Sequence, residues 1–260
     1  MDLKKLALTL FVGIILLFLL APILVIFLVS FNGTELLTFP PPSYSLRWFA
    51  QYFRNEEFIR STLLSLLIAV ESTVLVLFLG ILASLSITRY SFMGKRMVEI
   101  FLLSPLFIPR ILLGVGLLIL FVKLNLLGTL TGMVTAHVLI LVPYATRSLL
   151  VGFYGIDPSI EEAARCLGAH PVKAFFKVTL PLLKSGLLAA ALFSFITSFA
   201  DILLALFLSG PKTVTLPLRM FNYLEWNHDP FIAAMAVLQI VFILIMSLLL
   251  DRIVRLEKLI

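Results

Sequence analysis

Six long apolar runs dominate this sequence and limit what it can fold into. Each run is close to the roughly 20 residues that a helix needs to cross the hydrocarbon core of a bilayer. With 61% hydrophobic and 13% charged residues, the chain has too few polar side chains to cover a water-soluble fold of 260 residues. The runs are apolar on every face, whereas the strands of membrane barrels alternate apolar and polar residues. The sequence therefore predicts an all-α membrane protein with six transmembrane helices, at about residues 6–29, 62–86, 98–121, 130–151, 186–208 and 232–250.

The distribution of lysine and arginine predicts how these helices are oriented. Cytoplasmic loops of membrane proteins carry an excess of these two residues. With the N-terminus inside, the inner segments hold Lys4, Lys5, Arg89, Lys95, Arg96, Arg147, Arg165, Lys173, Lys177, Lys184, Arg252, Arg255 and Lys258. The outer segments hold only Arg47, Arg54, Arg60, Lys123, Lys212 and Arg219. We therefore expect both termini to be cytoplasmic, and the net charge of +6 gives no argument for a nucleic-acid partner.

The runs organise the chain as a single transmembrane domain over residues 1–260. An outer loop at about residues 30–61 contains three consecutive prolines and then an aromatic, half-polar helix. Aromatic amphipathic segments favour the membrane interface, so we expect this helix to lie there or to contact an external partner. A second polar segment, at about residues 152–185, is expected on the cytoplasmic side.

Three ionisable residues fall inside the predicted spans: Glu71, Arg110 and Asp201. Such residues are costly in a bilayer and tend to face a polar interior or a partner. Arg110 and Asp201 either pair with each other or line a solute pathway. Glu71 either makes an interhelical contact within the subunit or lies on the solute pathway.

Prolines indicate where the helices bend. Pro105 and Pro109 lie four residues apart in the third span, and each removes a backbone donor and clashes with the preceding turn. This span should therefore be kinked or broken. We take Pro105, Pro109 and Pro181 as candidate helix hinges.

The sequence carries no recognisable catalytic, metal or nucleotide site. His137, His170 and His228 lie on three different segments without ligand spacing, and Gly94-Lys95 lacks the upstream glycine of a phosphate-binding loop. The single Cys166 offers no metal cluster and no internal disulfide. We expect a protein that is not an enzyme and holds no cofactor, so that a mechanism using ATP would need it from another chain.

The polar segment has clear helix signals. Asp157 can cap a helix that begins with Pro158, and Gly168 can end that helix in a left-handed conformation. A second helix opens at Pro171 and is expected to end at Pro181, just before the fifth span. The first helix is too short to be stable alone in water, and its apolar stripe is suited to a shallow groove on a partner. The stripe consists of Ile160, Ala163, Ala164 and Leu167.

The same segment resembles a known family signature. Residues 162–181 are similar to the EAA-x3-G-x9-I-x-LP signature of ABC-importer permeases. The matching residues are Glu162-Ala163-Ala164, Gly168 after three residues, Val178 after nine more in place of Ile, and Leu180-Pro181. Four further stretches look like the spermidine/putrescine permease branch of that family: SFN, SLRWF, RYSFMGKR and FLSGPKTVTLPL.

The resemblance implies the fold and assembly of a type I ABC importer in the cell inner membrane. Its parts would be two permease subunits, identical or different, two cytoplasmic ATPases that bind the ATP, and an extracellular or periplasmic solute-binding protein. This chain would form the translocation pathway. The helix that couples it to an ATPase would carry Glu161, Glu162, Ala163, Ala164, Leu167 and Gly168.

The resemblance leaves the solute open. Polyamine permeases of this branch carry acidic residues where this chain has Arg110 and Ala200, so two carboxylates suited to a polycation are missing. An arginine near the pathway favours an anionic or zwitterionic solute, unless it only pairs with Asp201. The expected solute is therefore a polyamine or another small charged organic solute. The alternative is a stand-alone ion-coupled carrier with Glu71, Arg110 and Asp201 as a relay. Such carriers often show inverted repeats, and the chain has no second copy of its proline-containing third span. A membrane enzyme, a third possibility, lacks a catalytic cluster.

Overall fold

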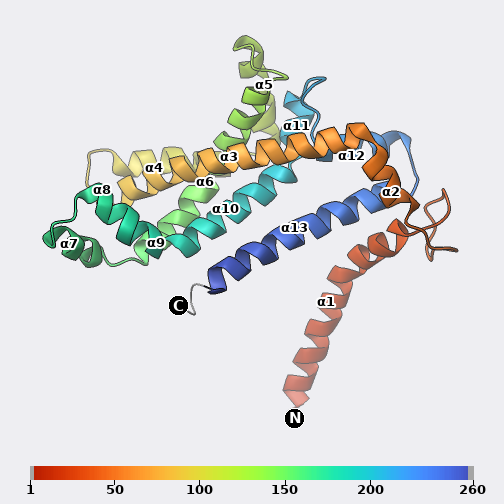
Figure 1. The fold of residues 1–260 in the computed structure, drawn as a ribbon, viewed down its shortest axis with the longest axis horizontal. Helices are drawn as coiled ribbons and strands as arrows, with labels where there is room; N and C mark the ends of the chain where they lie inside the picture. Colours follow the sequence, from red (N-terminus) through yellow and green to blue (C-terminus); the bar gives the residue numbers. More distant parts are fainter. Residues whose placement is uncertain (1–2, 257–260) are drawn as a thin grey trace. The chain divides into compact units, whose positions relative to one another are not determined.

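The computed structural model describes residues 3–256, without the side chains of residues 3, 4, 6, 7, 250, 251 and 253–256. Over this range the chain forms helices joined by turns and loops, without a β-strand (Figure 1). The helices are α1 (Leu3–Ser30), α2 (Arg47–Arg54), α3 (Glu56–Arg89), α4 (Lys95–Leu103), η1 (Ser104–Phe107), α5 (Arg110–Lys123), α6 (Leu130–Tyr154), α7 (Pro158–Cys166), α8 (Pro171–Ala174), η2 (Phe175–Thr179), α9 (Leu180–Leu182), α10 (Lys184–Phe199), α11 (Leu203–Leu208), α12 (Leu216–Trp226) and α13 (Phe231–Leu256).

The chain folds as two compact units. Among the described residues, the first unit combines residues 3–60 with Arg219–Ile245, and the second combines Ser61–Leu218 with residues 246–256. The predicted location of the two chain ends concerns residues 1–2 and 257–260, which lie outside the described residues.

Within residues 3–256, four helices are long and apolar enough to cross a membrane, and two bent helix pairs raise the number to six if each pair is one span. The single helices are Leu8–Ser30 of α1, all of α3 and α6, and Phe231–Leu249 of α13. The pairs are Lys95–Phe107 with Arg110–Lys123, and Pro171–Leu182 with Lys184–Phe199. The structure thus gives a helical membrane protein with four to six spans, and the predicted count of six lies at the upper end.

The third predicted span is broken. Its two halves, α4 with η1 and then α5, differ in direction by 104°. Ile108 between them is extended, as expected for a residue whose α conformation is disfavoured by the following Pro109. The break therefore lies where the sequence placed its prolines, and whether it moves as a hinge stays a prediction.

The fifth predicted span is not one helix over residues 186–208. Helix α10 ends at Phe199, and α11 starts at Leu203. Between them the Asp201 carboxylate accepts a hydrogen bond from the backbone N–H of Leu204 at 2.7 Å. An aspartate that bonds to nearby backbone in this way competes with the helix ladder, so the helix stops although the sequence stays apolar.

The second polar helix was expected to end at Pro181, but it does not. The helix runs on from α8 through η2 and α9 to Leu182, and η2 is a five-residue π-helix in which the N–H of Leu180 bonds to the carbonyl of Phe175. The wider π turn changes the hydrogen-bond pattern just before the proline, which has no N–H to donate. The bend of 71° follows, between α9 and α10.

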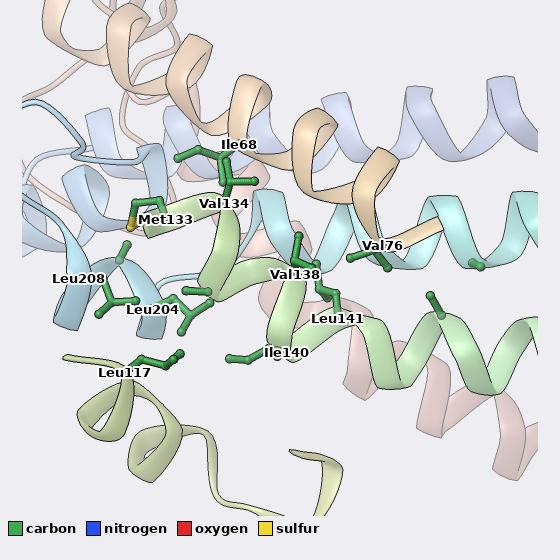
Figure 2. Close-up of a cluster of buried hydrophobic side chains, with 14 of the residues drawn as sticks. Ile68, Val76, Leu117, Met133, Val134, Val138, Ile140, Leu141, Leu204 and Leu208 are labelled. Carbon is green, nitrogen blue, oxygen red and sulfur yellow. The ribbon is translucent and has the colours of Figure 1, made fainter. Parts of the chain in front are cut away.

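The core of the second unit is built around α6, which packs against α10, α11 and η1. Helices α6 and α10 approach closely where Gly152 and Gly186 face each other. Ser84 of α3 donates to the carbonyl of Thr146 on α6 at 3.1 Å. Figure 2 shows the buried apolar side chains that these helices contribute, among them Ile68, Val76, Leu117, Met133, Val134, Val138, Ile140, Leu141, Leu204 and Leu208.

The first unit is held by aromatic side chains. The rings of Phe58 and Tyr223 each lie against Phe231, with centroids 5.2 Å apart. Trp48 of α2 is 5% exposed, and its Nε1–H donates to the carbonyl of Asn32 at 2.7 Å. Part of the aromatic helix predicted for the membrane interface therefore packs inside its own unit.

Candidate functional site

Helix α7 begins with the capping residues that the sequence predicted. The Asp157 carboxylate accepts from the backbone N–H of Ser159 at 2.9 Å, and Pro158 occupies the first turn. This backbone hydrogen bond favours the charged carboxylate and lowers the pKa of Asp157 below its usual value.

Gly168 ends α7, as predicted, with a φ of +89°. The N–H of Gly168 bonds to the carbonyl of Arg165, and the N–H of Ala169 bonds to the carbonyl of Ala164. These two bonds form a Schellman motif, which satisfies carbonyls at the helix end.

The chain leaves the apolar stripe of α7 uncovered. No residue of α7 is buried, and Ile160 and Leu167 are 45% and 90% exposed. In the second unit, α7 lies at the end of the α6–α10 pair away from α11 (Figure 1). A marginal helix of nine residues with an exposed apolar stripe is suited to a partner surface.

Two adjacent glutamates of α7 have different surroundings. Glu162 is exposed, whereas Glu161 is turned into the second unit. The Glu161 Oε2 atom accepts from the hydroxyl of Thr179 at 3.1 Å and lies 3.4 Å from Nε of Arg89.

The structure brings Arg110 and Asp201 together as an ion pair. Arg110 opens α5, directly after the break in the third span, and Asp201 lies in the break between α10 and α11. The Asp201 side chain is 2% exposed and that of Arg110 is 39% exposed. One ion pair therefore joins the breaks of two spans, where α5 packs on α11.

A buried histidine that was not among the predicted site residues completes this polar cluster. His137 of α6 lies with Nδ1 2.7 Å from the hydroxyl of Ser198, and both residues are at least 95% buried. The available signal was the spacing of Ser194, Ser198 and Asp201 in a mostly apolar run, which places three polar side chains on one helix face.

Glu71 is not part of this cluster. It is exposed on α3, among exposed apolar neighbours that include Val70 and Val74. No described side chain makes a hydrogen bond or an ion pair with Glu71, so the structure places it on an outer face of the second unit.

A second feature missed from the sequence is an open groove of about 610 Å³ between α6 and α10. The rings of Tyr144 and Phe193 lie in it with centroids 5.3 Å apart. Tyr144, Arg147, Ser148 and Val151 line it from α6 with the spacing i, i+3, i+4, i+7, a helix face with three polar residues that the sequence did contain. Within residues 3–256, no three His, Cys, Asp or Glu side chains are grouped so that they could hold a metal ion.

The described residues thus form a helical membrane protein with an exposed, capped helix between two of its spans. The chain belongs to the family of binding-protein-dependent transport system inner membrane components, whose model matches residues 76–257. It is a multi-pass inner-membrane protein and the permease component of an ABC importer. In this family the ATPase is a separate subunit.

Relatives by sequence confirm the resemblance to the spermidine/putrescine permease branch. The chain is 34% identical to the putrescine transport system permease protein PotI of Escherichia coli (strain K12), over 85% of this chain and 81% of the relative. It is 31% identical to the spermidine/putrescine transport system permease protein PotC of Haemophilus influenzae, over 82% of both chains.

Solved structures confirm the fold. A chain from the crystal structure of a bacterial ABC transporter involved in the import of the acidic polysaccharide alginate aligns with a TM-score of 0.77 at 18% identity, over 96% of this chain and 95% of that chain. A crystal structure of bacterial alginate ABC transporter in complex with alginate pentasaccharide-bound periplasmic protein gives the same TM-score at 16% identity, over 97% and 94% of the two chains.

Proposed function

We propose that this chain pairs with a second permease subunit to form the pathway of an ATP-driven importer, receives its solute from a binding protein, and is driven by two cytoplasmic ATPases. The exposed stripe of α7 carries the proposal, because a short helix with 90% exposed Leu167 at its end needs a partner surface. Lysine and arginine are in excess in the loops on the same side of the membrane as α7. This excess supports a cytoplasmic location for α7 and for both chain ends.

The coupling would be mechanical. Closure of the ATPases displaces α7, and the chain continues from α7 through α8, η2 and α9 into α10, which packs on α6. The displacement would thereby become a rigid-body rotation of two spans, with Pro181 and the breaks near Pro105 and Pro109 as hinges.

Changing the exposed stripe tests this docking. Leu167→Arg should remove ATPase subunits that co-purify with the wild-type complex and reduce uptake, because a charge would enter an apolar groove. Leu36→Arg is the matched control, since Leu36 is 70% exposed in the loop after α1. Co-purification that survives Leu167→Arg would contradict α7 as the docking helix.

Gly168 offers a second test of the same helix. Gly168→Ile would force a β-branched residue into a left-handed conformation that costs about 1–2 kcal/mol. We expect weaker ATPase co-purification and uncoupled transport. Unchanged uptake in proteoliposomes would contradict the proposal.

The solute is proposed to be a polyamine or another small charged organic solute. Support comes from the relatives described above, and from the Arg110–Asp201 ion pair, which neutralises the arginine that would otherwise oppose a cation. The groove with Tyr144 and Phe193 is proposed as part of the pathway, because aromatic faces attract organic cations.

Uptake of labelled putrescine into proteoliposomes with the binding protein, ATPases and ATP tests the solute. Arg147 adds a positive charge to the groove and would attract an anion. Unlabelled spermidine and a dicarboxylate of similar length should therefore be compared as competitors of putrescine uptake. Competition by spermidine supports a polyamine, and competition only by the dicarboxylate contradicts it. Uptake driven by a proton gradient without ATPases would favour a stand-alone carrier.

A further inference from the structure

Glu161 connects three parts of the second unit that are far apart in the sequence. It belongs to α7, its partner Arg89 is the last residue of α3, and its partner Thr179 is the last residue of η2. Arg89 also reaches the segment before α7, with its guanidinium Nη2 3.5 Å from the carbonyl of Ile156.

These contacts are largely shielded from solvent. The side chains of Arg89 and Glu161 are 13% and 19% exposed, and Thr179 is fully buried. The 3.4 Å contact between Arg89 Nε and Glu161 Oε2 is an ion pair without hydrogen-bond geometry, whereas the 3.1 Å bond from Thr179 is a hydrogen bond. Salt screens a shielded ion pair less than a surface pair. Two exposed long side chains also lose more conformational entropy when they are held in one geometry.

Backbone connections alone would link α7 only to α6 and α8. The Glu161–Arg89 pair adds a connection to the end of α3, a helix of 34 residues that packs on α6 through Ser84. The Glu161–Thr179 bond adds a direct connection to η2, which leads into α10. A movement of α7 would therefore reach two spans through one carboxylate.

We propose that Glu161 and Arg89 are positioning residues that transmit the displacement of α7 to α3 and, through Thr179, to α10. The inference rests on the proposed function, in which an ATPase displaces α7. It assigns different roles to two adjacent glutamates: the exposed Glu162 belongs to the docking surface, and Glu161 belongs to the transmission within this chain.

A charge swap tests the pair in the assembled importer. Arg89→Glu and Glu161→Arg should each lower uptake per ATP hydrolysed by about tenfold, within the usual range for coupling between sites. The amount of co-purified ATPase should stay at the wild-type level. The double variant Arg89→Glu with Glu161→Arg should recover at least half of the lost coupling, which a general loss of structure would not do.

The control is Arg96→Glu, a charge reversal at an exposed position in the first turn of α4. We expect unchanged uptake per ATP for this variant. Single variants of Arg89 and Glu161 that couple normally, or a double variant no better than the worse single one, would overturn the inference.

A second measurement does not depend on ATPases. Hydrogen exchange of the α7 backbone amides in the purified permease should become faster in Arg89→Glu and return toward the wild-type rate in the double variant. Unchanged exchange in Arg89→Glu would also overturn the inference. A wild-type permease that holds no ATPase would instead count against the proposed function, so the two failures are distinguishable.

Discussion

Asp201 is a buried carboxylate that depends on one distant and one local partner. The Arg110 guanidinium compensates its charge, and the N–H of Leu204 donates to it. Both ionisable residues could be predicted as important from their place in apolar runs. Their pairing could not be chosen over a solute contact, because the partners lie 91 residues apart and the break that turns Asp201 toward α5 leaves no hydropathy signal.

Arg110→Gln should lower the free energy of unfolding by about 3 kcal/mol, because it leaves the Asp201 carboxylate buried without a counter-charge. Asp201→Asn should cost less, since its side-chain oxygen still accepts from Leu204 and the 39% exposed Arg110 can reach water. Denaturant unfolding in detergent measures both. The double variant should be more stable than Arg110→Gln alone, and equal stability would contradict the pairing.

Asp157 makes the start of α7 sensitive to acid. The pKa of the Asp157 carboxyl is lower in the folded than in the unfolded protein. Its charged form therefore stabilises the fold at pH values above the pKa of the unfolded protein, and this contribution is lost as the pH falls through the pKa of the folded protein. Pepsin cleavage within residues 158–167 should therefore rise below about pH 4. In Asp157→Ser, whose hydroxyl caps without titrating, cleavage should depend on pH less, and an identical profile would contradict this role.

At the level of elements, local sequence signals predicted α7 well, but they did not predict the end of α10 or the π turn before Pro181. Asp157, Pro158 and Gly168 act on neighbouring backbone, so their effect on helix ends is readable from sequence. The end of α10 depends on the backbone bond of Asp201 and on its pairing with the distant Arg110, and the π turn depends on how the chain accommodates the missing donor of Pro181. Neither changes the apolar pattern that predicts a span.

Close backbone contact fixes the loops after α5 and α11. Gly128 has a φ of +70°, its N–H bonds to the carbonyl of Leu208, and a Cβ on Gly210 would lie 2.9 Å from the Gly128 Cα. Gly210→Ala should therefore destabilise the protein by about 1–3 kcal/mol, because backbone must shift.

Gly116 of α5 is the matched control for that substitution. A Cβ there meets nothing within 4 Å. Gly116→Ala should be neutral or stabilise by about 0.5–1 kcal/mol, as expected for a helix interior. Thermal unfolding in detergent compares the two variants, and equal effects would contradict the packing difference.

At the level of the whole molecule, the single cysteine can report the proposed orientation. Cys166 is exposed at the end of α7. A membrane-impermeant maleimide should label it in inverted vesicles and not in right-side-out vesicles, and bound ATPases should protect it. Leu36→Cys in a Cys166→Ser background should show the opposite sidedness. Labelling of Cys166 from the outer side would overturn the assigned topology.

The central position of α6 has a consequence for how the protein is made. Over 18 residues its mean hydropathy is 1.5, against 3.3, 2.5 and 2.7 for stretches of the same length in α1, α3 and α13, yet 56% of that stretch is buried, more than in any of those three. Lipid alone stabilises such a helix weakly, since His137 and Thr146 need protein neighbours. During synthesis, α6 should therefore leave the insertion machinery late, once α3 and α10 are present to receive it.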